Sequence, residues 1–443
     1  MDATTLVSGF NALILQLSSA FTAPTVETFR QVLFGWVLSP HPGPVTGMIR
    51  ALGCGAVKHW TVYEKFFYRA SWSPGELTRL LLLRLLRPLL GPTVNLNLDD
   101  TTCGPRGKHV ALAGWWKDHS AHARKDVFHW SHNWLVAAVS LRLKRWPLVR
   151  WTLPIACVLY RKSCHCDAPH PYASLPRLGA GLVAQVADVL AQHRLFVAVD
   201  ALYGTRDFFG KLPPNVAAVT RLRKDAALFA LPQPRPKGVG GRPRKKGLRL
   251  GAVEHLADDI QDWKTVTLHQ QGRKIRRKIA GFTCLWYHVC KDRPVRVVVM
   301  RDPTGQEDDL HLVCNDPTIC DAQIVQRYLD RWGIEECIEE AKQQMGMERT
   351  RGWCSNSVQR QAPVAMLVTS LVKLWYIRHA DQVAGLLPPE LPWYRHKQGV
   401  SYRDMLGALR MALWRQRVLC NSHAPRESLK TLNELTYVLC HAA

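Results

Sequence analysis

Two short hydrophobic runs that each end in aspartate constrain the fold of this chain most. The first, TVNLNLDD (93–100), alternates apolar and polar residues, which predicts a strand with one buried face. The second, LFVAVD (195–200), is apolar at almost every position, which is typical of a strand buried on both faces. A strand of the second kind lies inside a sheet that is covered on both sides. The two runs therefore predict a layered α/β fold.

The segments around these strands indicate five regions. We expect further strands at 134–143, 149–160 and 215–223 and a helix at 181–193. The regions are residues 1–90, helical and a candidate for DNA binding; 91–225, the first part of the α/β core; 226–318, a basic loop and a β-rich insertion; 319–356, a core helix; and 357–443, helical, with dimer or DNA contacts.

Two segments in these regions suggest contacts with nucleic acid. Residues 44–67 have the pattern of a helix, a glycine-containing turn and a helix, which fits a helix-turn-helix but also any helical hairpin. Residues 232–248, PQPRPKGVGGRPRKKGL, are too rich in Pro, Gly and cations to form a core. Arg242 and Arg244 in this loop are expected to contact DNA, in a minor groove or at phosphates.

The charge of the chain points to a polyanionic partner. Lys and Arg number 59 against 35 Asp and Glu, a formal charge of +24, and nucleic acid is the leading candidate. A merely basic protein, or one that binds an anionic membrane surface, would have the same composition. The first residues lack a basic signal region and the longest apolar stretches contain Arg or Lys, so no membrane span is expected.

The cysteines indicate a reducing compartment. Their number, 13, is odd and they are scattered, so we expect free thiols and a cytoplasmic protein. The local group Cys164-His165-Cys166-Asp167 has no second Cys/His pair at zinc-finger spacing nearby. We interpret these as loop residues without a metal.

The segment YLDRWGIEECIEEAKQQMG (328–346) predicts an amphipathic helix with an unusual polar stripe. A helix turns about 100° per residue, so Tyr328, Arg331, Glu335 and Lys342 fall within an arc of about 60°. An apolar stripe beside them would pack on a core, and Gly346 is a C-cap candidate. The helix thus presents a carboxylate flanked by cations and a tyrosine.

Three carboxylates form a candidate metal site: Asp100 and Asp200 at strand ends, and Glu335 on the helix. Carboxylates gathered this way are costly unless cations compensate them, and hard oxygen ligands suit Mg²⁺ or Mn²⁺. A pair of such ions supports phosphodiester chemistry. Each residue also has a structural alternative. Asp99 and Asp100 could start a turn, Asp200 could cap a helix, and Glu335 could pair with Arg331 or Lys342.

The spacing Tyr328-x2-Arg331-x3-Glu335-x6-Lys342 resembles the YREK signature of cut-and-paste insertion-sequence transposases of the DDE class. LDDTT resembles the first aspartate segment of that group and VAVDALYG the second. FHWSHNWLVAAV (128–139), and RLRKDAALF followed by a basic Gly-Arg-Pro loop, are similar to other recurrent stretches in these enzymes. The likeness runs from about residue 30 to about residue 415. It implies a ribonuclease-H-like mixed sheet as catalytic core, interrupted by a β-rich insertion and flanked by N- and C-terminal helical regions.

The resemblance also implies roles for these residues. Asp100, Asp200 and Glu335 would be the catalytic ligands of two Mg²⁺ ions, for which Mn²⁺ can substitute. Tyr328, Arg331 and Lys342 would hold phosphates of the cleaved end. Asp99 and Glu339 are the alternatives to Asp100 and Glu335. Trp263 and Trp286 either pack in the fold or stack on a displaced base.

As a hypothesis, the chain is a DNA transposase that cuts transposon ends and joins them to target DNA, with or without a hairpin intermediate. Its partners would be double-stranded DNA and a second copy of the chain, in a nucleoid-associated, bacterial-type setting. A ribonuclease-H-like nuclease or resolvase would cut without joining. A transposase-derived DNA-binding protein would do neither.

Overall fold

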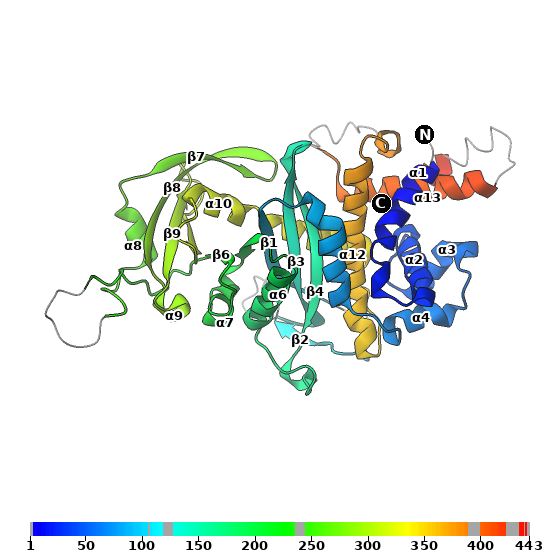
Figure 1. The fold of residues 1–443 in the computed structure, drawn as a ribbon, viewed down its shortest axis with the longest axis horizontal. Helices are drawn as coiled ribbons and strands as arrows, with labels where there is room; N and C mark the ends of the chain where they lie inside the picture. Colours follow the sequence, from blue (N-terminus) through cyan, green and yellow to red (C-terminus); the bar gives the residue numbers. More distant parts are fainter. Residues whose placement is uncertain are drawn as a thin grey trace.

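The computed structural model describes residues 3–104, 107–117, 127–234, 244–388, 399–421, 434–437 and 439–440. A long mixed sheet runs through this part of the chain, and the N- and C-terminal helices gather at one end of it (Figure 1). Arg242 and the rest of 235–243 lie outside the described residues.

The sheet contains ten described strands in the order β2-β3-β1-β5-β6-β10-β9-β8-β7, with β4 pairing on β3. β1 runs parallel to β5 and β5 parallel to β6, whereas β3 is antiparallel to β1 and β4 to β3. The strands are β1 Thr93–Cys103, β2 Gly114–Lys117, β3 Phe128–Leu143, β4 Trp146–Tyr160, β5 Arg194–Val199, β6 Val216–Arg221, β7 Lys264–Gln270, β8 Arg273–Leu285, β9 Pro294–Arg301 and β10 Leu310–Cys314. The expected α/β class, with a ribonuclease-H-like arrangement of β1, β3, β4, β5 and β6, is confirmed.

The β-rich segment between the two aspartate strands and the late helix extends this sheet. β10 pairs antiparallel with β6, and β9, β8 and β7 follow in order. Side chains of one face of these strands join Phe196 and Ala198 of β5 in one apolar cluster. The insertion expected at 226–318 therefore continues the core sheet.

The helices at the two ends of the chain pack on each other. Trp36 donates to the carbonyl of Met345 and Trp375 to that of Leu6, both at 2.9 Å. The N-terminal helices are α1 Ala3–Leu15, α2 Ala23–Leu38, α3 Val45–Leu52, α4 Trp60–Tyr68 and α5 Pro74–Leu80, the last continued by a π-helical turn, Leu81–Leu86. The C-terminal helices are α12 Ser355–His379 and α13 Tyr402–Asn421. α3 and α4 occupy the segment with the helix-turn-helix pattern, whose role in DNA binding stays a prediction.

The remaining helices are short or lie against the sheet. They are α6 Leu175–Val189, α7 Arg206–Phe209, α8 Val253–Asp258, α9 Tyr287–Cys290, α10 Asp321–Leu329 and α11 Trp332–Met345. Turns of 3₁₀ helix lie at Ser18–Ala20, Gly53–Gly55, Arg87–Leu89, Ser163–His165, Ala201–Tyr203 and Ala384–Leu386. The helix expected at 181–193 begins earlier, at Leu175, because Ser174 caps it by accepting a hydrogen bond from the amide of Arg177. Within the described residues, no helix is both long and apolar enough to cross a bilayer.

The prediction of one unbroken helix over 328–346 is wrong. α10 ends at Leu329 and α11 begins at Trp332, with a tight turn at Asp330 and Arg331. Backbone bonds from Arg331 to Tyr328 (3.0 Å) and from Ile334 to Arg331 (2.9 Å) span three residues instead of four. Asp330 is buried and accepts a bond from Arg142 of β3 at 2.8 Å, which ties the break to the sheet.

The end of α11 is fixed by a glycine, as predicted. Gly346 is the C-cap in the left-handed conformation, with φ of +66°. A Cβ atom added to it would lie 2.1 Å from the carbonyl oxygen of Pro42. The close approach joins α11 to the N-terminal helical region.

We predict that Gly346→Ala lowers the free energy of unfolding by about 2–4 kcal/mol, because alanine is strained at positive φ and its methyl group displaces Pro42. Gly181→Ala is the matched control: Gly181 lies inside α6 with open space around its Cα, so alanine should raise helix stability by about 1 kcal/mol. Denaturant unfolding of both variants checks this. Equal effects of the two substitutions would contradict the role of Gly346.

Candidate active site

Asp99 and Asp100 lie inside a strand. β1 continues to Cys103, and these two residues pair with Val136 and Leu135 of β3. The alternative in which they start a turn is therefore excluded. Because side chains alternate along a strand, Asp99 and Asp100 lie on opposite faces of the sheet.

Asp200 follows β5 directly beside them. β1 and β5 pair in parallel up to Asn97 and Ala198, and the same register carried on by two residues brings Asp200 level with Asp99. Asp200 stands at the N-cap of the short helix Ala201–Tyr203 but its side chain makes no capping hydrogen bond. The backbone carbonyl of Asp200 accepts a bond from the Thr220 hydroxyl at 2.8 Å. Its carboxylate is thus not used for capping.

All three aspartates act electrostatically on one buried tyrosine, Tyr203. Burial raises the pKa of Tyr203 well above its usual value, and the carboxylates of Asp100, Asp99 and Asp200 raise it further. Burial likewise raises the pKa of Tyr328, Arg331 lowers it, and Asp200 raises it again. Asp200 therefore lies within electrostatic reach of both tyrosines.

One guanidinium joins the strand to the helix. Arg331 donates to Asp99 Oδ2 and to Glu335 Oε1, each at 2.7 Å. Only 13% of the Arg331 side chain is exposed, against 19% for Asp99 and 33% for Glu335. Burial raises the pKa of Asp99 to about 6, although Arg331 lowers it and Asp100 raises it. The expected intrahelical pair of Glu335 with Arg331 is present, and the same cation also neutralises Asp99.

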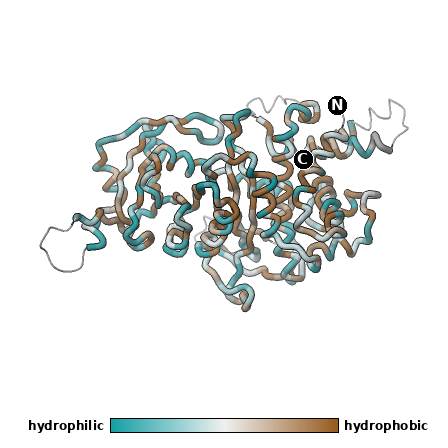
Figure 2. The backbone as a smooth tube through the Cα atoms, in the orientation of Figure 1, coloured by the Kyte–Doolittle hydropathy of each residue, from teal (hydrophilic) through white to brown (hydrophobic). Residues whose placement is uncertain are grey.

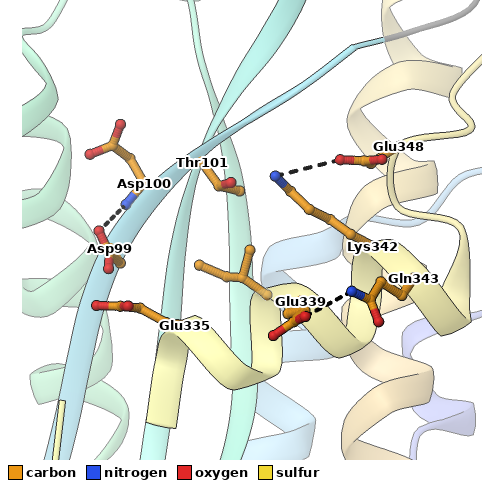
Figure 3. A pocket seen from close by; sticks show the side chains of 9 residues that line it. Asp99, Asp100, Thr101, Glu335, Glu339, Lys342, Gln343 and Glu348 are labelled. Atoms are coloured by element: carbon orange, nitrogen blue, oxygen red, sulfur yellow. Dashed lines mark hydrogen bonds and ion pairs between the residues drawn. The ribbon is translucent and has the colours of Figure 1, made fainter. Parts of the chain in front are cut away.

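A crevice of about 440 Å³ opens beside this pair (Figure 3). Lys342 lines it, donates to the carbonyl of Thr102 at 2.9 Å, and lies 3.5 Å from Glu348. Glu339, the alternative to Glu335, accepts a bond from Gln343 at 2.7 Å. The lining residues are Asp99, Asp100, Thr101, Glu335, Ile338, Glu339, Lys342, Gln343 and Glu348.

The structure separates Asp100 from Glu335 and brings Asp99 toward it. In Figure 3 the Asp99 and Glu335 side chains point toward one another, while the Asp100 carboxylate points away from Glu335. Asn133 of β3 donates to Asp100 Oδ2 at 3.2 Å. Sequence reasoning missed Asn133 and Tyr203, although both stand in segments that carry the resemblance, FHWSHNWLVAAV and VAVDALYG.

The predicted DNA contacts occupy different places. Tyr328 lies in the last turn of α10 and packs beside the apolar cluster of the insertion, with the Arg331 guanidinium carbon 5.8 Å from its ring centre. Arg331 and Lys342 both make protein contacts at the crevice. Arg244 is exposed and does not line the crevice.

The two tryptophans proposed for base stacking have packing roles. Trp286 is 6% exposed and meets Phe209 edge-on, with ring centres 5.7 Å apart. Trp263 is half-buried under Arg301, whose guanidinium carbon lies 4.5 Å from the ring centre. Of the two alternatives stated for these residues, packing in the fold describes both.

The crevice supplies carboxylates of the kind that bind divalent cations, but the described residues form no ready-made metal site. In the described ranges, no group of three or more His, Cys, Asp or Glu side chains is close enough to hold a metal ion. Asp200 does not line the crevice. The donors are nevertheless hard carboxylate oxygens, and Arg331 already places positive charge between two of them.

A family model described as DDE superfamily endonuclease matches residues 16–293, more than half of the chain. The chain belongs to this family. Membership makes it an endonuclease-type enzyme that acts on the phosphodiester bonds of DNA. The matched region contains Asp99, Asp100 and Asp200 but ends before α10, so Glu335 and the YREK spacing lie outside it. No curated protein matches the chain.

We predict that Arg331→Met destabilises the metal-free protein by about 3 kcal/mol, because it leaves two partly buried carboxylates without a counterion. Adding Asp99→Asn to the same chain should restore much of this loss, since it removes the more buried charge. A double-mutant cycle from unfolding curves measures the coupling. Strictly additive effects would show that the Asp99–Arg331 contact contributes nothing.

Proposed function

We propose that this DDE endonuclease is a cut-and-paste DNA transposase. The observation that supports this most is one crevice lined by Asp99, Asp100, Glu335 and Lys342, with Arg331 bonded to both Asp99 and Glu335. The alternative of a nuclease that only cuts does not explain why a tyrosine and two cations occur at the YREK spacing. A DNA-binding protein without catalysis gives no reason for the retained carboxylates.

In this proposal Asp100, Asp200 and Glu335 hold two Mg²⁺ ions. When bound, the ions supply Lewis-acid assistance to attack on the phosphodiester and to departure of the leaving oxygen. Asp99 acts differently: it is a positioning residue that holds Arg331 beside Glu335. This division requires the carboxylates of Asp100 and Glu335, which point apart in the metal-free protein, to turn toward the same ions.

The cations would then bind the backbone of the cleaved end. Lys342 lies at the crevice wall, where it can exchange the Thr102 carbonyl and Glu348 for a phosphate oxygen. Arg331 would lose part of its carboxylate pairing when metal ions take over Glu335. After strand cleavage, the free 3′-OH attacks either the opposite strand, giving a hairpin, or target DNA directly. Two copies of the chain, one per end, would form the working complex.

We predict that wild-type protein with Mg²⁺ cuts a plasmid carrying its gene and native flanks at the element's ends, and that Asp100→Asn, Asp200→Asn and Glu335→Gln each remove cutting but leave DNA binding intact. Asp99→Asn should reduce cutting without removing it. Gel analysis of the ends distinguishes hairpins from flush breaks. Inactive Asp99→Asn beside active Asp100→Asn would reverse the roles of the two aspartates, and cutting without joining would identify a nuclease.

We predict that Lys342→Ala weakens binding to end DNA and reduces the slope of log affinity against log salt by about 1, because one phosphate contact is lost. Lys224→Ala is the matched control: Lys224 is exposed and already paired with Glu254 at 2.6 Å. Its removal should leave the slope nearly unchanged. Fluorescence anisotropy over a salt series gives both slopes, and an unchanged slope for Lys342→Ala would remove it from the phosphate clamp.

A further inference from the structure

The β7–β8 hairpin carries a row of cations that the proposed chemistry does not use. Its two-residue turn, Gln271 and Gly272, has φ of 47° and 76°, as in the type I′ turns that join antiparallel strands closely. The register runs from Lys264 opposite Ile279 to Gln270 opposite Arg273. The hairpin is therefore a regular ribbon, and alternate residues of β8 lie on opposite faces.

One face of the ribbon holds Lys274, Arg276 and Lys278, which we call the outer cation row. All three are exposed. Alternate residues of a strand are about 6.7 Å apart, so the row extends over about 13 Å. The residues opposite them on β7 are His269, Thr267 and Thr265, which are polar. In Figure 2 hydrophilic residues dominate the arc that these two strands form.

The other face of the ribbon is anchored to α10. Ile275, Leu268 and Val266 belong to or pack on the apolar cluster that also includes Ile324 and Val325 of α10. The backbone of His269 exchanges two hydrogen bonds with the Gln326 side chain, each at 2.8 Å. The outer cation row therefore faces away from α10, on a ribbon whose position is fixed.

The chain neutralises a cation on the inner face but not those of the outer row. Arg277, between Arg276 and Lys278 in sequence, pairs with Asp302 at 3.1 Å and with Glu307 at 2.8 Å. Among the residues that the structure describes, no acidic side chain forms an ion pair with Lys274, Arg276 or Lys278. Three like charges spaced along one strand repel each other unless an external anion compensates them.

We propose that the outer cation row binds the phosphate backbone of duplex DNA on the side of the hairpin opposite α10. The inference rests on the proposed function, because it assigns a second contact surface for the same class of substrate. A row of about 13 Å lies within reach of several phosphates of one backbone strand. At the six paired positions from Thr265–Lys278 to His269–Lys274, the outer face carries polar or charged side chains and no large aliphatic one, which a protein partner would need as an anchor. Duplex DNA is therefore the occupant that fits its chemistry.

The test compares the full-length wild-type chain with the triple variant Lys274→Gln, Arg276→Gln, Lys278→Gln. Binding of a fluorescent duplex of generic sequence is measured without metal over a salt series. Loss of three phosphate contacts should reduce the slope of log affinity against log salt by about 3 and weaken binding at low salt about tenfold or more. The matched control is Arg177→Gln, Arg206→Gln, Lys211→Gln, which removes three exposed cations from α6, α7 and the turn after α7. It should change the slope far less.

A second measurement keeps the inference testable if the triple variant folds poorly. In the wild-type protein, Lys274 and Lys278 should be protected from acetylation when duplex is bound, whereas Lys211 should stay reactive, as read by mass spectrometry. The inference would be overturned if the triple variant kept the wild-type salt slope, or if the control variant lost as much slope as the triple variant. It would also be overturned if Lys274 and Lys278 were fully acetylated in DNA-bound protein. Neither assay involves cutting. If the wild-type protein bound duplex DNA through the outer cation row but did not cut DNA, the proposed function would be rejected and this inference would stand.

Discussion

The guanidinium of Arg331, held between Asp99 and Glu335, is the interaction on which the site depends. It joins Asp99 on a strand to Glu335 on a helix, 236 positions apart in the sequence, through two bonds of 2.7 Å. A carboxylate as buried as Asp99 is costly without a partner, and the next residue in the strand is another carboxylate. The cation lowers that cost and holds the first turn of α11 over β1. The crevice and the position of Lys342 at its wall follow from that placement.

The same interaction explains how a strand can hold two adjacent aspartates. Their side chains leave β1 on opposite faces, so Asp99 meets Arg331 while Asp100 meets Asn133 and the buried ring of Tyr203. Asp200 raises the pKa of Tyr203 as well, so both aspartate strands act on that ring. Like charges this close repel each other, and Arg331 is the cation that offsets the charge of Asp99.

Local patterns in the sequence were sufficient for much of the fold. Alternation in TVNLNLDD and the apolar run LFVAVD located β1 and β5, and glycine at 346 located the end of α11. The break at Asp330 and Arg331 could not be predicted this way, because both residues keep helical dihedral angles and Asp330 is held by Arg142, distant in sequence. The pairing of Asp99 and the burial of Trp286 also come from tertiary contacts. The spacing in 328–346 allowed the pair of Arg331 and Glu335 to be predicted, but not the second bond from Arg331 to Asp99.

The break between α10 and α11 lies where the two helices pack on different parts of one continuous sheet. β6 pairs with β10, so the insertion and the aspartate strands belong to one sheet, and α10 lies on the insertion while α11 lies on β1 and β4. Gly333 fixes the start of α11, because a Cβ atom there would lie 2.2 Å from the Thr152 hydroxyl of β4. The two helices are thus docked on different parts of the sheet, and the turn between them carries Arg331. The β7–β8 hairpin is bonded to Gln326 of α10, so α10 is held by the insertion while α11 is held by the aspartate strands.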